Sequence, residues 1–221
     1  MGEVEIDIAS KTIRVHSHII IYGDAVSGEL AALMQEEIET LWNEPKAHLY
    51  LKDHHFLVEF RISASVYSAI SDLDVISNTD PRKNFFRIEN FIHGNISFVD
   101  GLGCNSGYFL TENLYRGSTT AAHEYGHTLG LPHPKHLDIR GEGIPGIMYP
   151  RGTLVDPPYQ YDPTKPAGVT GGTMHPMHRK VRKQDIDDLK LERILNHPGI
   201  KIVGNFTNIY HNKHIPGSVE R

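Results

Sequence analysis

The spacing of apolar residues along the chain predicts a strand followed by a helix at the start. Residues 11–23 alternate between polar and apolar, become continuously apolar and stop at a glycine, which is typical of a strand. In residues 25–44 apolar side chains recur at helical spacing, Ser27 can cap the helix, and Pro45 ends it. This part of the chain is therefore expected to form a strand and an amphipathic helix.

Several shorter patterns follow. Residues 55–68 have a mixed strand pattern, and residues 84–91 and 94–101 are two shorter strand candidates. Residues 106–113 predict a last strand, which we place at the edge of the sheet. An extended substrate could pair with the backbone of such an edge strand, although an ordinary paired strand explains the pattern as well.

The second half of the chain contains less regular structure. A helix is expected to begin at Ser118 or Thr119 and to end at Gly130. Residues 132–172 are rich in Pro, Gly, Asp and Tyr without periodicity, and a loop this long is usually functional or organised by a metal. Two later elements are expected, a helix over residues 181–197 and a strand in the tail over residues 200–212.

These elements predict the α+β fold class, with an α/β-type N-terminal lobe. The length of 221 residues and an apolar content of 39% suit a single domain with a substantial core. We expect residues 1–130 to form an N-terminal lobe that includes the second helix. Residues 131–221 then form a smaller, irregular C-terminal lobe with one closing helix.

Composition excludes some classes of function. The net charge is -5 and no polybasic patch is present, so nucleic acid is not an expected partner. A single cysteine excludes an intrachain disulfide. The N-terminal stretch lacks the basic and then apolar pattern of a signal peptide, and no apolar run has the length of a membrane span. We expect a monomer, and leave a cytoplasmic or exported location open.

Residues 121–133, AAHEYGHTLGLPH, combine three histidines with a glutamate. Residues four apart share a face of a helix, so His123 and His127 can both direct a ring nitrogen at one ion. Glu124 then lies beside the ion, where a carboxylate can hold a water molecule without occupying a coordination position. Glycine adopts a left-handed turn without steric cost, so Gly130 can end the helix and bring back His133.

Three protein ligands are typical of a catalytic zinc ion, because the fourth position stays open for water. The alternative interpretation is a surface helix with solvated histidines. A second alternative is a set of buried neutral histidines satisfied by the core, and it does not explain why three cluster and a carboxylate joins them. The motif therefore predicts one catalytic Zn²⁺ bound by His123, His127 and His133.

The sequence HEYGHTLGLPH resembles the signature of the metzincin zinc peptidases, and more narrowly that of the matrixins, the matrix metalloproteinase type. A second motif, GIPGIMYP over residues 143–150, is similar to the matrixin Met-turn and supplies Met148 in the right order after His133. The resemblance implies a twisted mixed β-sheet with a backing helix and an active-site helix. It also implies that Met148 forms an apolar floor beneath the ligands, and that Tyr149 and Pro150 line the substrate pocket.

The chain also departs from the matrixin pattern. Cys104 lies in GLGCNSG and not in a latency propeptide, and we expect it to be an ordinary buried residue or an unreactive thiol. The ion-binding loop of matrixins is not visible, and His93 is the only nearby candidate ligand, so a structural Ca²⁺ or second Zn²⁺ is not carried over. Residues 151–181 form a longer connection than the resemblance implies, either a lid or an exosite. Within it, His175 and His178 are expected to be loop histidines.

The resulting hypothesis is a zinc-dependent endopeptidase in which Glu124 acts as the general base. A protein or peptide substrate with an apolar residue after the scissile bond, and a protein inhibitor, are the expected partners. Two alternatives stay open. One is a catalytically silent zinc-binding or regulatory domain, and the other is a zinc hydrolase that acts on a non-peptide amide.

Overall fold

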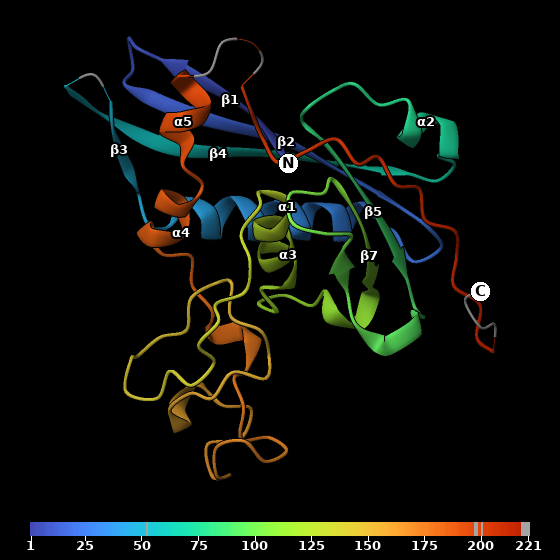
Figure 1. The fold of residues 1–221 in the computed structure, drawn as a ribbon. Coiled ribbons are helices and arrows are strands. Elements are labelled where there is room, and N and C mark those ends of the chain that lie inside the picture. Colours follow the sequence, from blue (N-terminus) through green and yellow to red (C-terminus); the bar gives the residue numbers. More distant parts are fainter. Residues whose placement is uncertain (52, 197–198, 200, 218–221) are drawn as a thin grey trace.

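The centre of the computed structural model, which describes residues 1–51, 53–196, 199 and 201–217, is a curled mixed β-sheet with helices packed against it (Figure 1). The strands are β1 (Gly2–Asp7), β2 (Thr12–Tyr22), β3 (His48–Leu51), β4 (His54–Tyr67), β5 (Lys83–Glu89), β6 (Phe98–Val99), β7 (Ser106–Leu110) and β8 (Ile202–Val203). The helices are α1 (Gly28–Asn43), α2 (Asp72–Ile76), α3 (Thr120–Thr128), α4 (Lys183–Asp188) and α5 (Leu191–Asn196). The α+β class is therefore confirmed at this coarse level.

The long strand β2 organises the sheet. It pairs in parallel with β4 along one edge, and its other edge is shared by β1, which is antiparallel, and β5, which is parallel. Beyond β5 come β7, in parallel, and then β6, which is antiparallel to β7 and forms the edge. The last strand, β8, pairs with β1 in antiparallel orientation. Parallel β2 and β4 are joined through α1, as a parallel pair requires a crossover connection.

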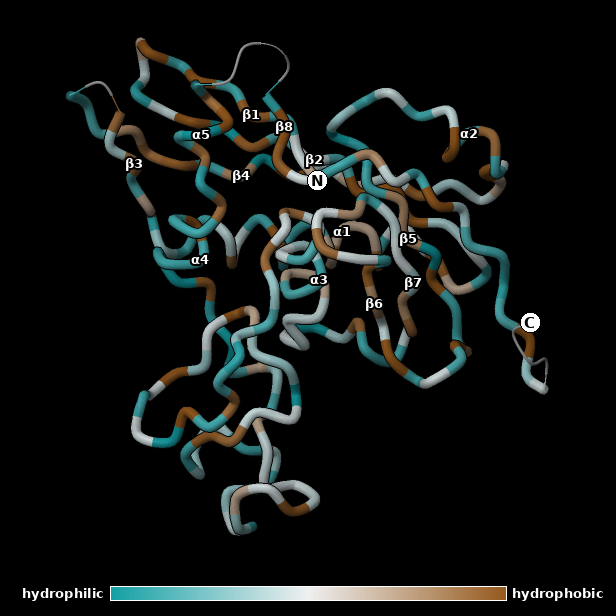
Figure 2. The backbone as a smooth tube through the Cα atoms, in the orientation of Figure 1, coloured by the Kyte–Doolittle hydropathy of each residue, from teal (hydrophilic) through white to brown (hydrophobic). Residues whose placement is uncertain are grey.

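The two faces of β2 explain its change of pattern. Its odd-numbered residues, such as Val15 and Ile19, are buried in the main core with the α1 residues Met34 and Trp42. Ile20 points to the opposite face and belongs to a second cluster under α2. The end of β2 is therefore buried on both faces, which requires a continuous apolar run and not an alternating one. Figure 2 shows hydrophobic stretches along the strands of this sheet.

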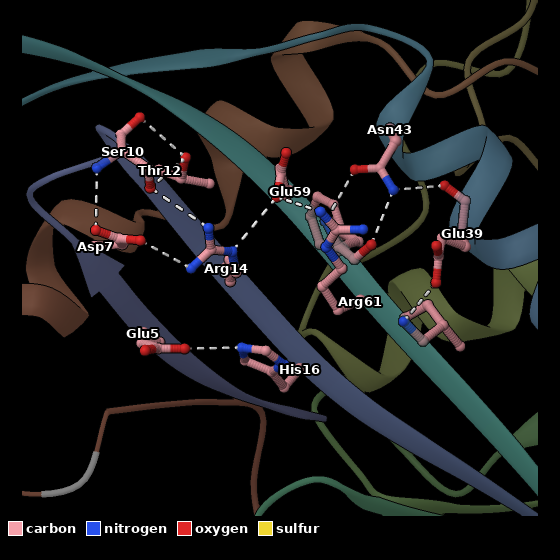
Figure 3. A network of polar contacts seen from close by, with 12 residues as sticks. Glu5, Asp7, Ser10, Thr12, Arg14, His16, Glu39, Asn43, Glu59 and Arg61 are labelled. Carbon is pink, nitrogen blue, oxygen red and sulfur yellow. Dashed lines mark hydrogen bonds and ion pairs between the residues drawn. The ribbon is translucent and has the colours of Figure 1, made fainter.

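Side chains of α1 protect the free backbone edge of β4 beyond the short β3. The Asn43 side chain donates to the Phe60 carbonyl and accepts from the Phe60 amide, each at 2.9 Å, as a neighbouring strand would. Glu39 accepts from the Ile62 amide at 2.8 Å. Both contacts are drawn in Figure 3, together with ion pairs that link β1, β2 and β4. Edge groups that would otherwise invite pairing with another chain are thus satisfied within the protein.

Several expected elements are confirmed, and others are wrong. The strands β2, β4 and β5 and the helix α1 with its Ser27 cap lie where the sequence predicts them. The sequence patterns missed β1, β3 and the one-turn helix α2, which are short or irregular in polarity. Residues 94–101 contain only the two-residue strand β6. The prediction that residues 106–113 form the edge is also wrong, because β6 covers β7.

The lobe that follows α3 is irregular, as the aperiodic residues 132–172 predict, and it lies to one side of the sheet (Figure 1). It has a small core of its own, formed by Ile139, Val155 and Met174. Its 3₁₀ turns are Pro157–Tyr159 and Pro176–His178, while His93–Asn95 and Thr111–Asn113 precede α3. Among the described residues, no helix is long and apolar enough to span a membrane.

The closing helix is broken into α4 and α5, whereas the sequence predicts one helix over residues 181–197. Lys190, between them, has a left-handed backbone with φ of 53°. Its amide donates to the Asp187 carbonyl, which ends α4. The apolar spacing hides this break because Leu189 and Leu191 are buried on both sides of it. His197 and Ile200, which bound the expected helix and tail strand, lie outside the described residues.

Replacing Lys190 by glycine should therefore stabilise the protein. A left-handed conformation costs a residue with a side chain about 1 kcal/mol, and glycine does not incur this cost. We expect Lys190→Gly to raise the free energy of unfolding by about 0.5–1 kcal/mol in a urea titration. The control is Lys183→Gly in the right-handed first turn of α4, which should lower it by a similar amount. Equal effects of the two substitutions would contradict the assignment of strain to Lys190.

Candidate metal centre

One face of helix α3 packs against α1. The indole nitrogen of Trp42 donates to the Ala122 carbonyl at 3.1 Å, and the Trp42 ring meets the Tyr125 ring edge-on at 5.7 Å. The Tyr125 hydroxyl is hydrogen bonded to Ser17 of β2 at 2.8 Å. These buried polar contacts have fixed directions, so they set the rotation of α3 about its axis. The histidines therefore face away from the sheet at a defined angle.

The N-terminus of α3 is capped from α1. Thr119 occupies the capping position, as the sequence predicts, but it has a left-handed φ of 55° and makes no side-chain capping bond. Ser118 accepts only from the Thr120 amide, at 3.2 Å. Instead, the Glu37 carboxylate accepts from the amides of Thr119 at 3.2 Å and Ala122 at 3.3 Å. Burial raises the pKa of Glu37, and these amide hydrogen bonds oppose the rise.

The C-terminus of α3 turns sharply at Gly130, whose φ is 96°. The Gly130 amide donates to the His127 carbonyl, and the Leu131 amide donates to the Gly126 carbonyl. This pair of hydrogen bonds is the Schellman arrangement, which requires a left-handed residue at the position of Gly130. The chain reverses within three residues, and His133 comes back over the end of the helix.

Three ring nitrogens meet at this turn. The His133 Nε2 atom lies 3.1 Å from the Nε2 atom of His123 and 3.1 Å from that of His127. One nitrogen from each of the three rings lies within 4.8 Å of the others, so the group could hold a metal ion. Ligands about 2.0–2.1 Å from a tetrahedral ion are separated by roughly 3.3 Å, which is close to the 3.1 Å between His133 and each of the other two rings.

The protonation of the rings also fits a metal site. His123 Nδ1 donates to the Ile147 carbonyl at 2.7 Å, and His127 Nδ1 donates to the Leu131 carbonyl at 2.8 Å. Each Nδ1 therefore carries the proton, and each Nε2 presents a lone pair to the centre. Burial lowers the pKa of all three histidines, that of His127 to about 4, so they are neutral at pH 7. The lone pairs of His123 and His127 therefore both face the Nε2 atom of His133.

Glu124 is buried beside the three histidines, with 7% of its surface exposed. Burial raises its pKa to about 8, and the Arg179 guanidinium, the Val99 amide and the Arg151 guanidinium oppose the rise. Glu124 and the three histidines line one cavity of about 460 Å³. The edge strand β6 lines the same cavity, and the Val99 amide of this strand faces Glu124.

The predicted floor and wall residues lie in different places. Met148 is buried against α3, where a side chain on Gly126 would meet its sulfur at 2.4 Å. Pro150 lines the cavity as expected. Tyr149 does not, because its ring packs against the small core of the C-terminal lobe. His175 and His178 lie in that lobe with their ring centres 5.9 Å apart and are not part of the histidine group.

Sequence patterns missed four residues of this region. Arg151, Arg179 and Thr120 line the cavity, and Glu37 caps α3. Glu37 interrupts the apolar side of its helix, a local signal of a buried polar role. The two arginines lie in the aperiodic lobe, where no spacing rule distinguishes them.

No protein-family model matches the chain, and no curated protein is detectably similar to it. The resemblance to metzincins therefore rests on the two short motifs.

Removing the Glu37 carboxylate should destabilise the N-terminus of α3 and its packing on α1. Glu37→Ala leaves the amides of Thr119 and Ala122 without their acceptor, and loss of a helix cap costs about 1–2 kcal/mol. We expect this fall in the free energy of unfolding by chemical denaturation. The matched control is Glu36→Ala, since Glu36 is exposed and, among the residues that the structure describes, pairs with Arg116. A loss as large in Glu36→Ala would contradict the capping role of Glu37.

Proposed function

We propose that the protein is a zinc-dependent endopeptidase. The observation that supports this most directly is the convergence of three neutral histidine nitrogens at 3.1 Å beside the buried Glu124 carboxylate. Neutral imidazole nitrogens suit zinc, and three protein ligands are the usual set of a catalytic zinc site. The resemblance of the two motifs to those of the matrixins points to the same function.

The residues of the chain divide the chemistry between them. Zinc held by His123, His127 and His133 would lower the pKa of a water molecule and polarise a carbonyl group. Glu124 accepts the proton of the attacking water and passes it to the leaving amine. The Arg179 guanidinium opposes the rise in the pKa of Glu124 that burial causes, and the charge of a bound zinc ion would lower that pKa further, towards the ionised form that this role requires. The carbonyl oxygens of Ile147 and Leu131 hold the His123 and His127 rings in position.

The edge strand β6 supplies a surface for an extended peptide. One side of β6 pairs with β7, and residues of β6 line the cavity that contains Glu124. A substrate chain can add to such an edge through its main-chain groups, which gives affinity without sequence preference. This feature favours a peptide over a small amide as the substrate. It also replaces residues 106–113 with β6 as the strand proposed to bind substrate.

Substitution of the third ligand tests the metal site. We expect His133→Ala to lower zinc affinity by at least about a hundred-fold, since two histidines remain of three ligands. The measurement is zinc content by elemental analysis after dialysis against a weak chelator. His136→Ala, three residues further on, is the matched control and should keep one zinc per chain. Unchanged zinc in His133→Ala would show that another residue is the third ligand.

Substitution of the carboxylate tests the reaction. Glu124→Gln keeps the size of the side chain but cannot accept the proton, so peptide cleavage should fall by about 10²–10⁴-fold. Zinc content should stay unchanged, because Glu124 is not among the grouped ligands. Cleavage is measured with quenched fluorescent peptides and the zinc-loaded protein. If the zinc-loaded wild type cleaves no peptide, the endopeptidase proposal fails and a silent zinc-binding domain is favoured.

A further inference from the structure

Two arginines of the C-terminal lobe line the cavity of the candidate metal centre. Arg179 is 3% exposed, and its guanidinium donates to the Thr119 hydroxyl at 2.9 Å and to the Tyr149 carbonyl at 3.3 Å. Arg151 is more exposed and donates to the Asn113 side-chain oxygen at 2.9 Å. All of these acceptors are neutral. Within the described part of the chain, neither guanidinium forms an ion pair with a carboxylate.

A buried guanidinium without a carboxylate partner is unfavourable, and this chain shows the usual solution elsewhere. Arg87, which is also buried, lies 2.6 Å from the Glu89 carboxylate. Arg179 lacks such a contact, and burial lowers its pKa to about 10. The positive charge is therefore retained at a cost in folding free energy, as is common for groups that bind a ligand.

The carboxylates that interact electrostatically with Arg179 have other roles. Glu37 is bound to the amides at the start of α3, and Glu124 is the proposed proton carrier. Both act on Arg179 from a distance and not through an ion pair. The two arginines therefore remain available for an anion that enters the cavity.

A third group in the cavity also lacks a partner. The Thr120 hydroxyl is buried and makes no hydrogen bond in the protein. Thr120 lies four residues before Glu124, so both side chains are on the same face of α3. A buried hydroxyl without a partner is costly, and a ligand oxygen would satisfy it. Two guanidinium groups and a free hydroxyl together match a carboxylate, which accepts several hydrogen bonds.

We propose that this part of the cavity binds a carboxylate of the substrate on the leaving-amine side of the scissile bond. This inference rests on the proposed function. Glu124 delivers a proton to the leaving amine, and Thr120, one turn before it on α3, lies next to Thr119, to which Arg179 is hydrogen bonded. The carboxylate is either an acidic side chain or the C-terminus of the substrate. An acidic side chain directly after the scissile bond would replace the apolar preference that the matrixin resemblance implies, whereas a C-terminal carboxylate would add to it.

Three blocked peptides of one sequence distinguish these sources. The first peptide has leucine after the scissile bond and an amidated C-terminus. The second has glutamate in place of that leucine and is also amidated. The third keeps the leucine but ends two residues after it with a free carboxylate. We expect kcat/KM of the zinc-loaded protein to be at least about ten-fold higher for one carboxylate peptide than for the neutral one. If kcat/KM for the neutral peptide equals or exceeds the values for both carboxylate peptides, the carboxylate site is overturned. Cleavage of the neutral peptide would still support the proposed endopeptidase function.

The variants test which residues carry the preference. Arg151→Gln and Arg179→Gln should each lower the ratio of the carboxylate to the neutral kcat/KM by at least several-fold. Arg61→Gln, on the exposed side of β4, removes the same charge far from the cavity and should leave the ratio unchanged. Since Arg179 is buried, the exposed Arg151 keeps the test valid if Arg179→Gln does not fold. Unchanged ratios in Arg151→Gln would exclude it from the site.

A binding measurement separates this inference from the proposed reaction. The same peptides are titrated into zinc-loaded Glu124→Gln protein and followed by fluorescence anisotropy. We expect about ten-fold tighter binding of one carboxylate peptide, and loss of this difference when Arg151→Gln is added. If wild-type protein cleaves no peptide but this difference is present, the reaction is wrong and the carboxylate site stands. Equal affinities for all three peptides would overturn the carboxylate site, whether or not cleavage occurs.

Discussion

The docking of α3 on α1 is the contact on which the candidate site depends. The Trp42 indole and the Glu37 carboxylate bind backbone groups of α3, while Tyr125 anchors it to β2. Directional hydrogen bonds in a buried interface allow one position of the helix, whereas apolar packing alone would permit rotation and sliding. This packing of α3 on α1 and β2 determines the positions of His123 and Glu124. The candidate site is therefore held in place partly by Trp42 and Glu37, which lie outside the sequence motifs.

The sequence predicted those features that depend on local spacing alone. The spacing of His123 and His127, followed by Gly130 and His133, specifies a helix and a turn, and the structure brings the three rings together. The amphipathic α1 and the long β2 and β4 were also predictable, because one periodicity persists through each of them. Short elements such as β3 and α2 were not, since tertiary contacts and not local preference form them.

Residues whose role depends on distant contacts could not be predicted. Arg179 reaches the cavity because its lobe folds around a small core and presents it to the start of α3. The edge position of β6 depends on a pairing that two residues of sequence do not reveal. The break at Lys190 was hidden by apolar residues on both sides. Each of these features belongs to the arrangement of elements and not to any single pattern.

Because the C-terminal lobe has a core of its own, the residues of the site come from two separately packed parts of the protein. His123, His127 and Glu124 lie on α3, which packs on the main core, while His133, Pro150, Arg151 and Arg179 lie in the segment that follows α3. On the proposed function, the first part determines what reaction occurs and the second determines which molecules undergo it. Because loops tolerate insertion and exchange far better than a packed sheet, drift or recombination within the lobe can redirect the protein to new targets. The hydrolytic machinery would then persist unchanged through such evolution.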